Sequence, residues 1–314
     1  FRIISPSFTS IMSFILSSLG VIFKFTGNIV AYNAEKFHKN LPPAPNSAAF
    51  PHALTKRGGG RRILAVNDSL IEGTMLYYIS VCIITVLAGI AHGVCGFGAG
   101  IVMMTVLPSF FSISQSAAIV GVVCIALTSL MILRYRKHVS PRKVIFPLIV
   151  YSAASAAAIH FSSAVDQALL KRVFGVFLLV LAAYHFMPSR KQHTKWSLPV
   201  SIAAWVFSGV CSGLFSVGGP LMVLYYLSHT DSKEEYLGTT ELLFLISHFV
   251  NAYMRVRDGI LTPALIPAIL MCVVCICAGL FIANRIVDKT DGDKLKNIVY
   301  IGVAVSGAVN LLGL

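Results

Sequence analysis

The amino-acid sequence predicts an all-α, polytopic membrane protein with about eight transmembrane helices in two four-helix repeats whose helices are broken at glycines. Three observations predict this fold class. Of the 314 residues, 56% are hydrophobic and only 12% are charged, which is about half the charged fraction of a soluble domain. Apolar runs close to the roughly 20 residues that cross a hydrocarbon core follow one another from residue 75 onwards. Two glycine-rich segments also recur at a shift of 120 residues.

The charge and cysteine content narrows the classes of partner. The 25 Lys+Arg against 12 Asp+Glu give a net charge of +13, but the cations cluster between apolar runs, as loop charges of membrane proteins do. No zinc-finger, helix-turn-helix or aromatic–basic pattern is present, so no nucleic-acid partner is expected. The seven cysteines lie in apolar stretches and are expected to pack as small hydrophobes. The sequence therefore predicts the lipid bilayer as a partner, and neither a metal site nor a cofactor.

The first 74 residues differ from the rest of the chain. The apolar stretch 11–23 is short and rich in serine, and it is followed by four prolines between residues 42 and 51 and by the basic, glycine-rich stretch 56–62. This composition is typical of a linker. We expect 1–74 to be an N-terminal extension that is dispensable for the working protein, which we expect to start at Met75.

The apolar runs from Met75 onwards must form helices, because a bilayer offers the backbone no hydrogen-bond partners. The predicted spans are 75–94, 115–133, 144–161, 172–187, 198–215, 238–254, 262–283 and 296–313. Two shorter stretches that carry Gly and Pro, 97–108 and 217–227, are expected to form re-entrant or half-helices. The chain then divides into a first transmembrane repeat over 75–194 and a second over 195–314.

Charge asymmetry predicts the orientation of these spans. The loop 134–143 holds five Lys/Arg, and the sixth predicted span ends at Arg255 and Arg257, whereas the acidic segment 229–235 is expected on the opposite face. The positive-inside rule then places the basic loops and both termini in the cytoplasm, in a plasma (bacterial inner) membrane. The basic loop 284–295 falls on the outer side in this assignment.

The repeat rests on more than glycines. At a shift of 120 or 121 residues, several features coincide: Gly89 with Gly209, Gly93 with Gly213, Gly98 with Gly218, Pro147 with Pro267, and Arg134-x-Arg136 with Arg255-x-Arg257. Both arginine pairs lie in basic loops, so matching parts of the two repeats face the same side of the membrane. The repeats are therefore parallel if the short stretches do not count as crossings. They are inverted if the short stretches do count.

Glycine-broken helices at matching positions of two repeats point to a transporter's binding site at the repeat interface. A broken helix frees backbone N–H groups, and its N-terminus carries partial positive charge, so an anion site forms without a buried lysine. The residues predicted to bind or pass the substrate are His92, Gly93, Gly96, Phe97, Gly98, Gly100, Gln115, Ser116, Ser212, Gly213, Ser216, Gly218, Gly219, Pro220, His248 and Asn251.

Three ionisable groups at membrane depth, His92, Glu241 and His248, are candidates to couple anion movement to protons. The hydroxyl residues Thr128, Ser129, Thr239 and Thr240 are expected to line the same polar cavity.

The segments 93–100 (GVCGFGAG) and 213–220 (GLFSVGGP) resemble the paired glycine motif of the TauE/SafE sulfite exporter family of membrane permeases. The turn that carries Arg255-x-Arg257-Asp258-Gly259 is similar to that family's short basic connection, and the resemblance covers 75–314. It implies a secondary transporter for small anions such as sulfite, a sulfonate or a related organic anion, working as an exporter. Three residues depart from the family pattern: Ala99 and Ser216 stand where glycine is commoner, and Pro220 interrupts the second segment.

Two other functions stay open from the residues alone. A membrane-embedded enzyme of the aspartyl type needs paired buried carboxylates, and Asp166, Asp231 and Asp258 all fall in predicted loops. A haem-bearing electron carrier needs histidines at matched depth on facing helices, whereas the histidines here scatter along the spans. The absence of a Walker motif means that ATP-driven transport would need a separate subunit. The transporter interpretation is favoured over both, and the protein is not expected to be an enzyme.

Overall fold

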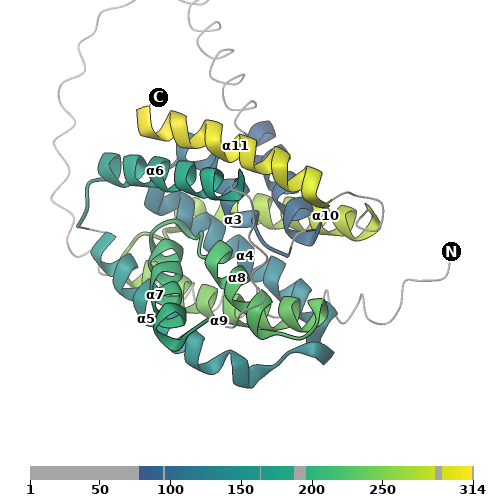
Figure 1. The fold of residues 1–314 in the computed structure, drawn as a ribbon. Helices are drawn as coiled ribbons and strands as arrows, with labels where there is room; N and C mark the ends of the chain where they lie inside the picture. The colour runs from purple at the N-terminus through teal and green to yellow at the C-terminus, as the bar shows by residue number, and fades with distance from the viewer. Residues whose placement is uncertain (1–77, 95, 163, 187–195, 287–291, 313–314) are drawn as a thin grey trace, which may run out of the picture.

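The computed structural model describes residues 78–94, 96–162, 164–186, 196–286 and 292–312, and the elements of this part of the chain are helices (Figure 1). The predicted extension 1–74, the predicted start at Met75 and Cys95 lie outside the described residues. The long helices are Tyr78–Val94, α4 (Ile113–Tyr135), α5 (Ile145–Ser162), α6 (Gln167–Phe186), α7 (Leu198–Phe215), α9 (Lys233–Arg257), α10 (Ile266–Ile286) and α11 (Gly292–Leu312). The short ones are α3 (Ala99–Met104), α8 (Gly219–His229) and the 3-10 turns Leu107–Ser109, Arg136–His138, Pro141–Lys143 and Pro263–Leu265.

Five of the described helices are long and apolar enough to cross a membrane: Ile113–His138, Ile145–Ser162, Gln167–Tyr184, Leu198–Phe215 and Pro263–Arg285. Large apolar side chains on their outer faces are exposed, such as Phe161 at 69% and Val274 at 70%. A surface of this kind suits a bilayer better than water. The other predicted spans, 75–94, 238–254 and 296–313, fall on the helix Tyr78–Val94, α9 and α11, and α9 carries charged residues near both ends.

Contacts between helix ends define two ends of the molecule. At one end, which we call the Lys143 end, the ammonium of Lys143 lies 2.8 Å from the Glu235 carboxylate at the start of α9. The Tyr226 hydroxyl near the end of α8 donates a hydrogen bond to the Lys143 carbonyl (3.3 Å). Arg134, in the last turn of α4, binds Asn284 near the end of α10. The ends of α4, α8 and α10 and the starts of α5 and α9 therefore share this end.

The opposite end, which we call the Arg257 end, holds the other termini of these helices. There the Arg257 guanidinium at the end of α9 lies 3.4 Å from the His160 ring at the end of α5. The Gln167 side chain at the start of α6 binds the Ser114 hydroxyl at the start of α4. Each of α4, α5, α9 and α10 therefore runs from one end of the molecule to the other.

The chain order produces two hairpins that penetrate the molecule from opposite ends. The helix Tyr78–Val94 packs parallel to α10, because Gly89 lies against Ile276 and Gly93 against Ala283. The first hairpin, Tyr78–Val94 with α3, therefore enters from the Arg257 end and returns there to start α4. The second hairpin, α7 with α8, enters from the Lys143 end and returns there through Tyr226.

Four assignments made from the charge pattern are wrong. Arg257 was expected on the same side as the loop 134–143, but it lies at the opposite end of the molecule, beside His160. The acidic segment 229–235 does not lie opposite the basic loop 134–143, since Lys143 and Glu235 form an ion pair. The loop 284–295 begins beside Arg134 and not on the opposite face. Arg255 is not a loop cation but is buried in α9, with 2% of its surface exposed. The physical reason for the first three errors is the second hairpin, which brings the chain back to the end that α7 left.

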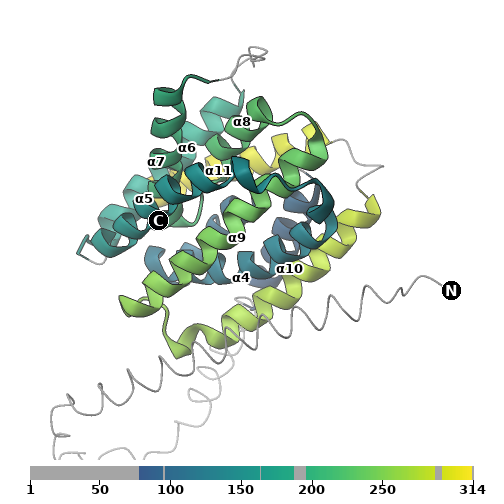
Figure 2. The same ribbon diagram turned by 90° about the horizontal axis from the view of Figure 1, so that it is seen from below.

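The helices α4 and α9 form the centre of the molecule and cross it side by side (Figure 2). They run antiparallel, because Ala117 near the start of α4 contacts Arg255 near the end of α9. Both helices begin with a serine cap, since Ser112 accepts from the Gln115 amide and Ser232 from the Glu235 amide. Such a cap satisfies N–H groups that the first turn would otherwise leave free.

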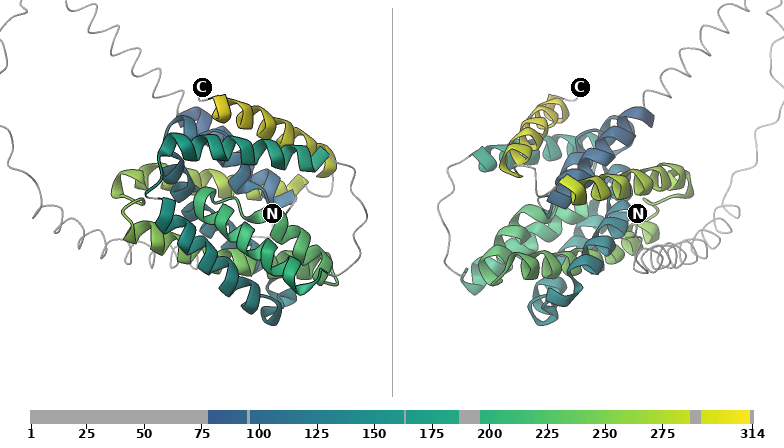
Figure 3. Two further views of the ribbon diagram at one scale, coloured as in Figure 1. Left: turned by 60° about the vertical axis from the view of Figure 1, so that its left-hand side comes forward. Right: turned by 90° about the vertical axis from the view of Figure 1, so that its right-hand side faces the viewer.

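A second antiparallel pair, α6 with α11, lies along one edge of the bundle (Figure 3). The backbones approach closely at two glycines: a side chain on Gly175 would lie 2.6 Å from the Leu311 nitrogen and one on Gly307 3.0 Å from Leu179. Small residues at such contacts are how membrane helices pack tightly. The sequential counterparts at a shift of about 120 residues, α4 with α9 and α6 with α11, thus run in opposite directions.

Candidate functional site

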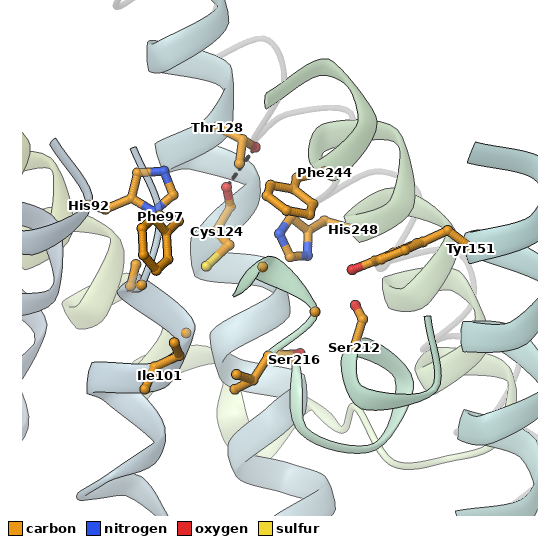
Figure 4. A pocket seen from close by; sticks show the side chains of 16 residues that line it. His92, Phe97, Ile101, Cys124, Thr128, Tyr151, Ser212, Ser216, Phe244 and His248 are labelled. Carbon is orange, nitrogen blue, oxygen red and sulfur yellow. Dashed lines mark hydrogen bonds between the residues drawn. The ribbon is translucent and has the colours of Figure 1, made fainter. Parts of the chain in front are cut away.

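The tips of the two hairpins meet in the middle of the molecule. A side chain on Gly100, just beyond the first tip, would lie 2.5 Å from the Ser216 carbonyl oxygen in the second tip. A small cavity of about 40 Å³ lies between them (Figure 4). Its lining residues come from both hairpins and from α4, α5 and α9: His92, Phe97, Gly98, Ala99, Gly100, Ile101, Cys124, Thr128, Tyr151, Ser212, Ser216, Val217, Gly218, Gly219, Phe244 and His248.

Both tips owe their shape to unusual backbone conformations. Gly98 has φ +104° and no atom within 4 Å of the position that a Cβ would take, so the requirement for glycine there is conformational. In the second tip, Ser216 ends α7 with φ 55° and is the one described non-glycine residue with positive φ. Helix α8 then begins at Gly219 with no side-chain cap on its first amides. Gly218 and Gly219 line the cavity, so the positive end of the α8 dipole lies beside it.

A buried acid–base pair lies next to the cavity at the first hairpin. The Nε2 atom of His92 is 2.8 Å from Oε1 of Glu241. Glu241 comes from α9 and its side chain is fully buried, while that of His92 is 6% exposed. The second atom of each group, Nδ1 of His92 and Oε2 of Glu241, has no hydrogen-bond partner among the described residues. Such unpaired buried polar atoms are costly, and they need an explanation in function, bound water or bound ligand.

His248 lies two turns further along α9 and faces the cavity (Figure 4). Its side chain is buried, with 8% of the residue exposed, and its Nδ1 atom also has no partner in the described part of the chain. The Tyr151 and Ser212 hydroxyls approach each other beside it. The cavity thus combines two unpartnered ring nitrogens, two hydroxyls and the start of α8 at Gly218 and Gly219. The hydroxyls and a protonated Nδ1 of His248 are able to donate hydrogen bonds to an anion, whereas Nδ1 of His92 donates only when that ring is doubly protonated, because its Nε2 binds Glu241.

On the side of Ser212 away from the cavity, hydrogen bonds between three side chains connect α7 to α5 and α9. The Asn251 amide donates to the Ser212 hydroxyl (3.2 Å), and the Ser155 hydroxyl donates to the Asn251 carbonyl oxygen (2.7 Å). All three side chains are buried. Asn251 therefore orients a residue of the cavity wall and does not line the cavity itself.

An arginine lies on the far side of the same wall. The Arg255 guanidinium donates to the Ser216 hydroxyl (2.9 Å) and to the carbonyl oxygens of Ser212 (3.4 Å), Gly213 (2.8 Å) and Ala117. It is the largest of the fully buried side chains in the described residues. Arg255 thus connects α9 to the end of α7 and to α4 at the second hairpin tip.

The structure brings together half of the residues predicted to form the site. Those that line the cavity are His92, Phe97, Gly98, Gly100, Ser212, Ser216, Gly218, Gly219 and His248, with Thr128 from the hydroxyl set. Glu241 and Asn251 contact lining residues from behind. The remaining predicted residues, Gly93, Gly96, Gln115, Ser116, Gly213, Pro220, Ser129, Thr239 and Thr240, do not line it.

The residues outside the cavity have local structural contacts. Gly93 and Gly213 allow close packing against Ala283 and Ala158. The Gln115 side chain accepts a hydrogen bond from the Ser112 amide at the start of α4. Pro220 lines a neighbouring apolar pocket of about 180 Å³ between α6, α7 and α8. Ser116 is buried, and its hydroxyl has no partner among the described residues.

Sequence reasoning missed Tyr151, Cys124 and Phe244 as lining residues and Arg255 as a buried residue. The first three are apolar or aromatic residues within apolar runs, where nothing in the pattern separates a cavity wall from ordinary core. A signal did exist for Arg255, since it lies one helical turn after Asn251 and two turns after His248 on the same face of one predicted helix.

Comparison with known proteins gives one match. The family model described as "Sulfite exporter TauE/SafE" matches residues 81–309, a range that contains both hairpins and the cavity. No curated protein and no solved structure matches the chain. The matched family consists of membrane transporters, and the apolar helices agree with an integral membrane protein. The chain therefore belongs to the TauE/SafE sulfite exporter family of membrane permeases.

Proposed function

We propose that this protein is a secondary transporter that exports a small oxyanion of the sulfite type across the plasma (bacterial inner) membrane, and that the anion binds in the cavity between the hairpin tips. The single observation that supports this most strongly is the pair of unpartnered, buried histidine nitrogens at that cavity, Nδ1 of His92 and Nδ1 of His248. A bound oxyanion would accept a hydrogen bond from a protonated Nδ1 of His248, and from Nδ1 of His92 when that ring is doubly protonated, since its Nε2 binds Glu241. The uncapped start of α8 would contribute amides and partial positive charge.

The size of the cavity favours a compact substrate. A volume of about 40 Å³ corresponds to on the order of three water-sized spheres. Sulfite, with a sulfur and three oxygens, is of this size. A sulfonate carries an organic group beside its sulfur head, so it would require the hairpin tips to separate further. We therefore place sulfite-like inorganic anions ahead of sulfonates and carboxylates.

We further propose that His92 and Glu241 couple transport to protons, with His248 in contact with the substrate. The His92 ring lines the cavity and binds the Glu241 carboxylate at 2.8 Å. A proton that reaches this pair changes the net charge beside the substrate by one unit, and it does so inside a low-dielectric environment where charges interact strongly. Anion movement and proton movement would then depend on each other.

The fold supports a repeat over 75–194 and 195–314 that is inverted rather than parallel. Each proposed repeat has a hairpin followed by three long helices, and α4 and α6 run opposite to their counterparts α9 and α11. In place of eight crossings, we propose six, with two hairpins that enter the bilayer from opposite faces. Inverted repeats of this kind provide two related conformations, one open to each side.

Within the described residues, the Lys143 end carries most of the Lys and Arg. It holds Arg134, Arg136, Lys137, Arg142 and Lys143 in a single connection. By the positive-inside rule, we propose that this end faces the cytoplasm. The first described helix starts, and α11 finishes, at the Arg257 end. The proposal therefore differs from the orientation expected from the sequence, because it places both of these helix ends outside.

The test is anion flux through the full chain in proteoliposomes. Sulfite, sulfate, methanesulfonate and acetate are compared, with and without a pH gradient. We expect sulfite to move fastest and its flux to depend on the gradient. The variant His248→Gln should lower sulfite flux about tenfold or more, since a hydrogen bond to a charged group contributes about 1.5–3 kcal/mol.

A matched control is His229→Gln at the end of α8, where the ring bonds to the Tyr225 carbonyl and the Ser228 hydroxyl, away from the cavity. This variant should transport like the parent protein. Absence of flux for all four anions, or equal loss in both variants, contradicts the proposed function.

A further inference from the structure

The guanidinium of Arg255 is buried, and none of its hydrogen-bond partners in the described residues carries a formal charge. Its partners are the carbonyl oxygens of Ser212, Gly213 and Ala117 and the Ser216 hydroxyl. All of these are neutral. No carboxylate forms an ion pair with it in the part of the chain that the structure describes.

The acidic groups nearest in sequence have other partners. Asp258, three residues further along, binds Arg257 and lies 3.5 Å from His160. Glu241 is 14 residues earlier on α9 and therefore about 21 Å away along the helix axis, and it binds His92. A buried charge without a counter-ion is expensive. The protein bears this cost at the wall of its central cavity.

The Arg255 guanidinium is bonded directly to residues that line the central cavity. Ser216, which receives a hydrogen bond from Arg255 at 2.9 Å, lines the cavity, and so does Ser212, whose carbonyl accepts another. The guanidinium therefore lies directly behind the second hairpin tip. Gly121 on α4 leaves the space for it, because a Cβ there would be 2.8 Å from Nη1 of Arg255.

The two hairpin tips differ in charge. The first is flanked by the His92–Glu241 pair, and Leu237 and Tyr236 lie against its Gly96. The sequence counterpart of Arg255 is Arg134, which is exposed at the Lys143 end and binds Asn284. A buried cation without a carboxylate partner is thus found at the second tip and not at the first, in the described residues.

We infer that Arg255 supplies the fixed positive charge that makes the cavity selective for anions, and that the transported anion is its counter-ion. This inference rests on the proposed function and names a selectivity residue for it. Four N–H groups of the guanidinium are already used in bonds to the protein, so Arg255 attracts the anion through the Ser216 wall without touching it. Arg255 also holds the α7 break in place, so charge and hydrogen-bond geometry must be separated by experiment.

The experiment compares Arg255→Gln and Arg255→Lys with the parent protein in sulfite-loaded proteoliposomes. Lysine keeps the charge but loses the fork of donors, whereas glutamine removes the charge and keeps a donor. We expect Arg255→Gln to raise the apparent KM for sulfite about 10- to 1,000-fold, the range over which a charged low-dielectric cleft concentrates counter-ions. Arg255→Lys should recover most of that loss, and the maximal rate should change less than KM in both.

Arg134→Gln is the matched control, since it removes the counterpart cation at the exposed end of α4 and should leave KM unchanged. Thermal unfolding in detergent monitors folding of each variant. If Arg255→Lys and Arg255→Gln lose transport equally while both fold, the residue acts through hydrogen-bond geometry and the inference is overturned. It is overturned as well if both retain the parent KM.

If Arg255→Gln does not fold, the Arg255→Lys variant alone tests the inference. Because lysine keeps the positive charge, the inference predicts a KM for sulfite close to that of the parent protein, and a large increase in KM contradicts the inference. Absence of sulfite flux in the parent protein would refute the proposed function and not this inference alone, so the two failures are distinguishable.

Discussion

At the scale of single residues, Glu241 is a fully buried acid beside the cavity. Its side chain is fully buried, one carboxylate oxygen binds His92 and the other has no partner among the described residues. Glu241→Gln keeps the shape and a hydrogen bond but cannot titrate. We expect it to bind sulfite and to lose the dependence of flux on a pH gradient, which is measured in proteoliposomes at equal and unequal pH.

Glu241→Ala serves as the companion variant, because it leaves His92 buried without a partner. It should lower the free energy of unfolding by about 3–5 kcal/mol, more than the glutamine variant. A surface control, Glu234→Gln, should change neither property. Gradient-dependent flux that survives in Glu241→Gln would remove Glu241 from the coupling mechanism.

Gly218 is predicted to be sensitive to substitution because the Tyr151 hydroxyl, the Ser208 carbonyl oxygen and the Ser212 Cβ all lie too close for an added Cβ. A Cβ on Gly218 would collide with the Tyr151 hydroxyl, whereas one on Gly219 would meet only the Cβ of Phe97, at 3.8 Å. We expect Gly218→Ala to destabilise the protein by about 1–3 kcal/mol and Gly219→Ala to have a much smaller effect on stability. Thermal unfolding of the purified variants measures both.

The double variant Gly218→Ala, Tyr151→Phe tests the cause. Removal of the hydroxyl removes the closest of the three clashing atoms, so part of the stability lost in Gly218→Ala should return. An additive loss in the double variant would show that another contact is responsible, with the Ser208 carbonyl as the next nearest group.

How much of the site was predictable differs from residue to residue. His92 and His248 were predictable, because an ionisable residue within an apolar run is conspicuous and costly. Arg255 was not placed correctly, since it stands beside Arg257 at the end of such a run, where the positive-inside rule normally assigns cations to a loop. Its burial depends on α9 continuing through Arg257 and on the acceptors that the α7 break provides, and both are tertiary facts.

At the scale of elements, the contact between the connection α4–α5 and the start of α9 is expected to depend on pH. Glu235 lies outside the membrane-spanning part of α9. Its pKa falls from the ordinary 4.5 to about 2, chiefly because its carboxylate accepts a hydrogen bond from the Asp231 amide, and further because it binds the Lys143 ammonium and the Ser140 hydroxyl.

The sign of the pH effect follows from this lowered pKa. A carboxylate whose pKa is lower in the folded state contributes stability that is fully present above its unfolded pKa and is lost as the pH falls through its folded value. The difference in stability between the parent and Glu235→Gln, about 0.2–1 kcal/mol for a contact of this exposure, should therefore stay constant from pH 7 to about pH 5. It should shrink between pH 4.5 and pH 2.

Unfolding curves recorded across this range measure the difference, with Glu234→Gln as the control for a neighbouring carboxylate on the same turn. A difference that disappears between pH 7 and pH 5 would show that the contact does not form as described.

The hairpins mark the limit of sequence-based prediction for elements. Their positions were predictable, because dense glycine and a proline interrupt apolar runs at 93–100 and 213–220. Their return to the end from which they start was not, since a break only permits a turn and does not fix its direction. That direction depends on packing, such as Trp205 against Tyr225 between α7 and α8.

At the scale of the whole molecule, the direction of each hairpin fixes the side on which every later loop lies. Composition and periodicity were enough to predict a membrane protein. The orientation expected from the charges was not reproduced, because it depends on whether an even or odd number of crossings precedes each loop, and each hairpin that does not cross changes that number. With both hairpins re-entrant, Asn284, where the predicted loop 284–295 begins, lies at the Lys143 end and contacts Arg134 of the basic connection 134–143.

Single cysteines test the topology of six crossings and two hairpins directly. A membrane-impermeant thiol reagent is added to intact cells and to inside-out vesicles that contain Lys137→Cys, Asp231→Cys or Asp166→Cys. Lys137 and Asp231 flank the Lys143 end and Asp166 lies at the start of α6 at the Arg257 end. We expect the first two to react only in inside-out vesicles and the third only in intact cells, with the parent protein as the control for the native cysteines. Labelling of Lys137→Cys and Asp231→Cys from opposite sides would restore eight crossings and would contradict the ion pair between Lys143 and Glu235. Labelling of those two from one side and of Asp166→Cys from the other would agree with six crossings and two hairpins. In that arrangement one hairpin enters the bilayer from each face and the two meet at the anion cavity.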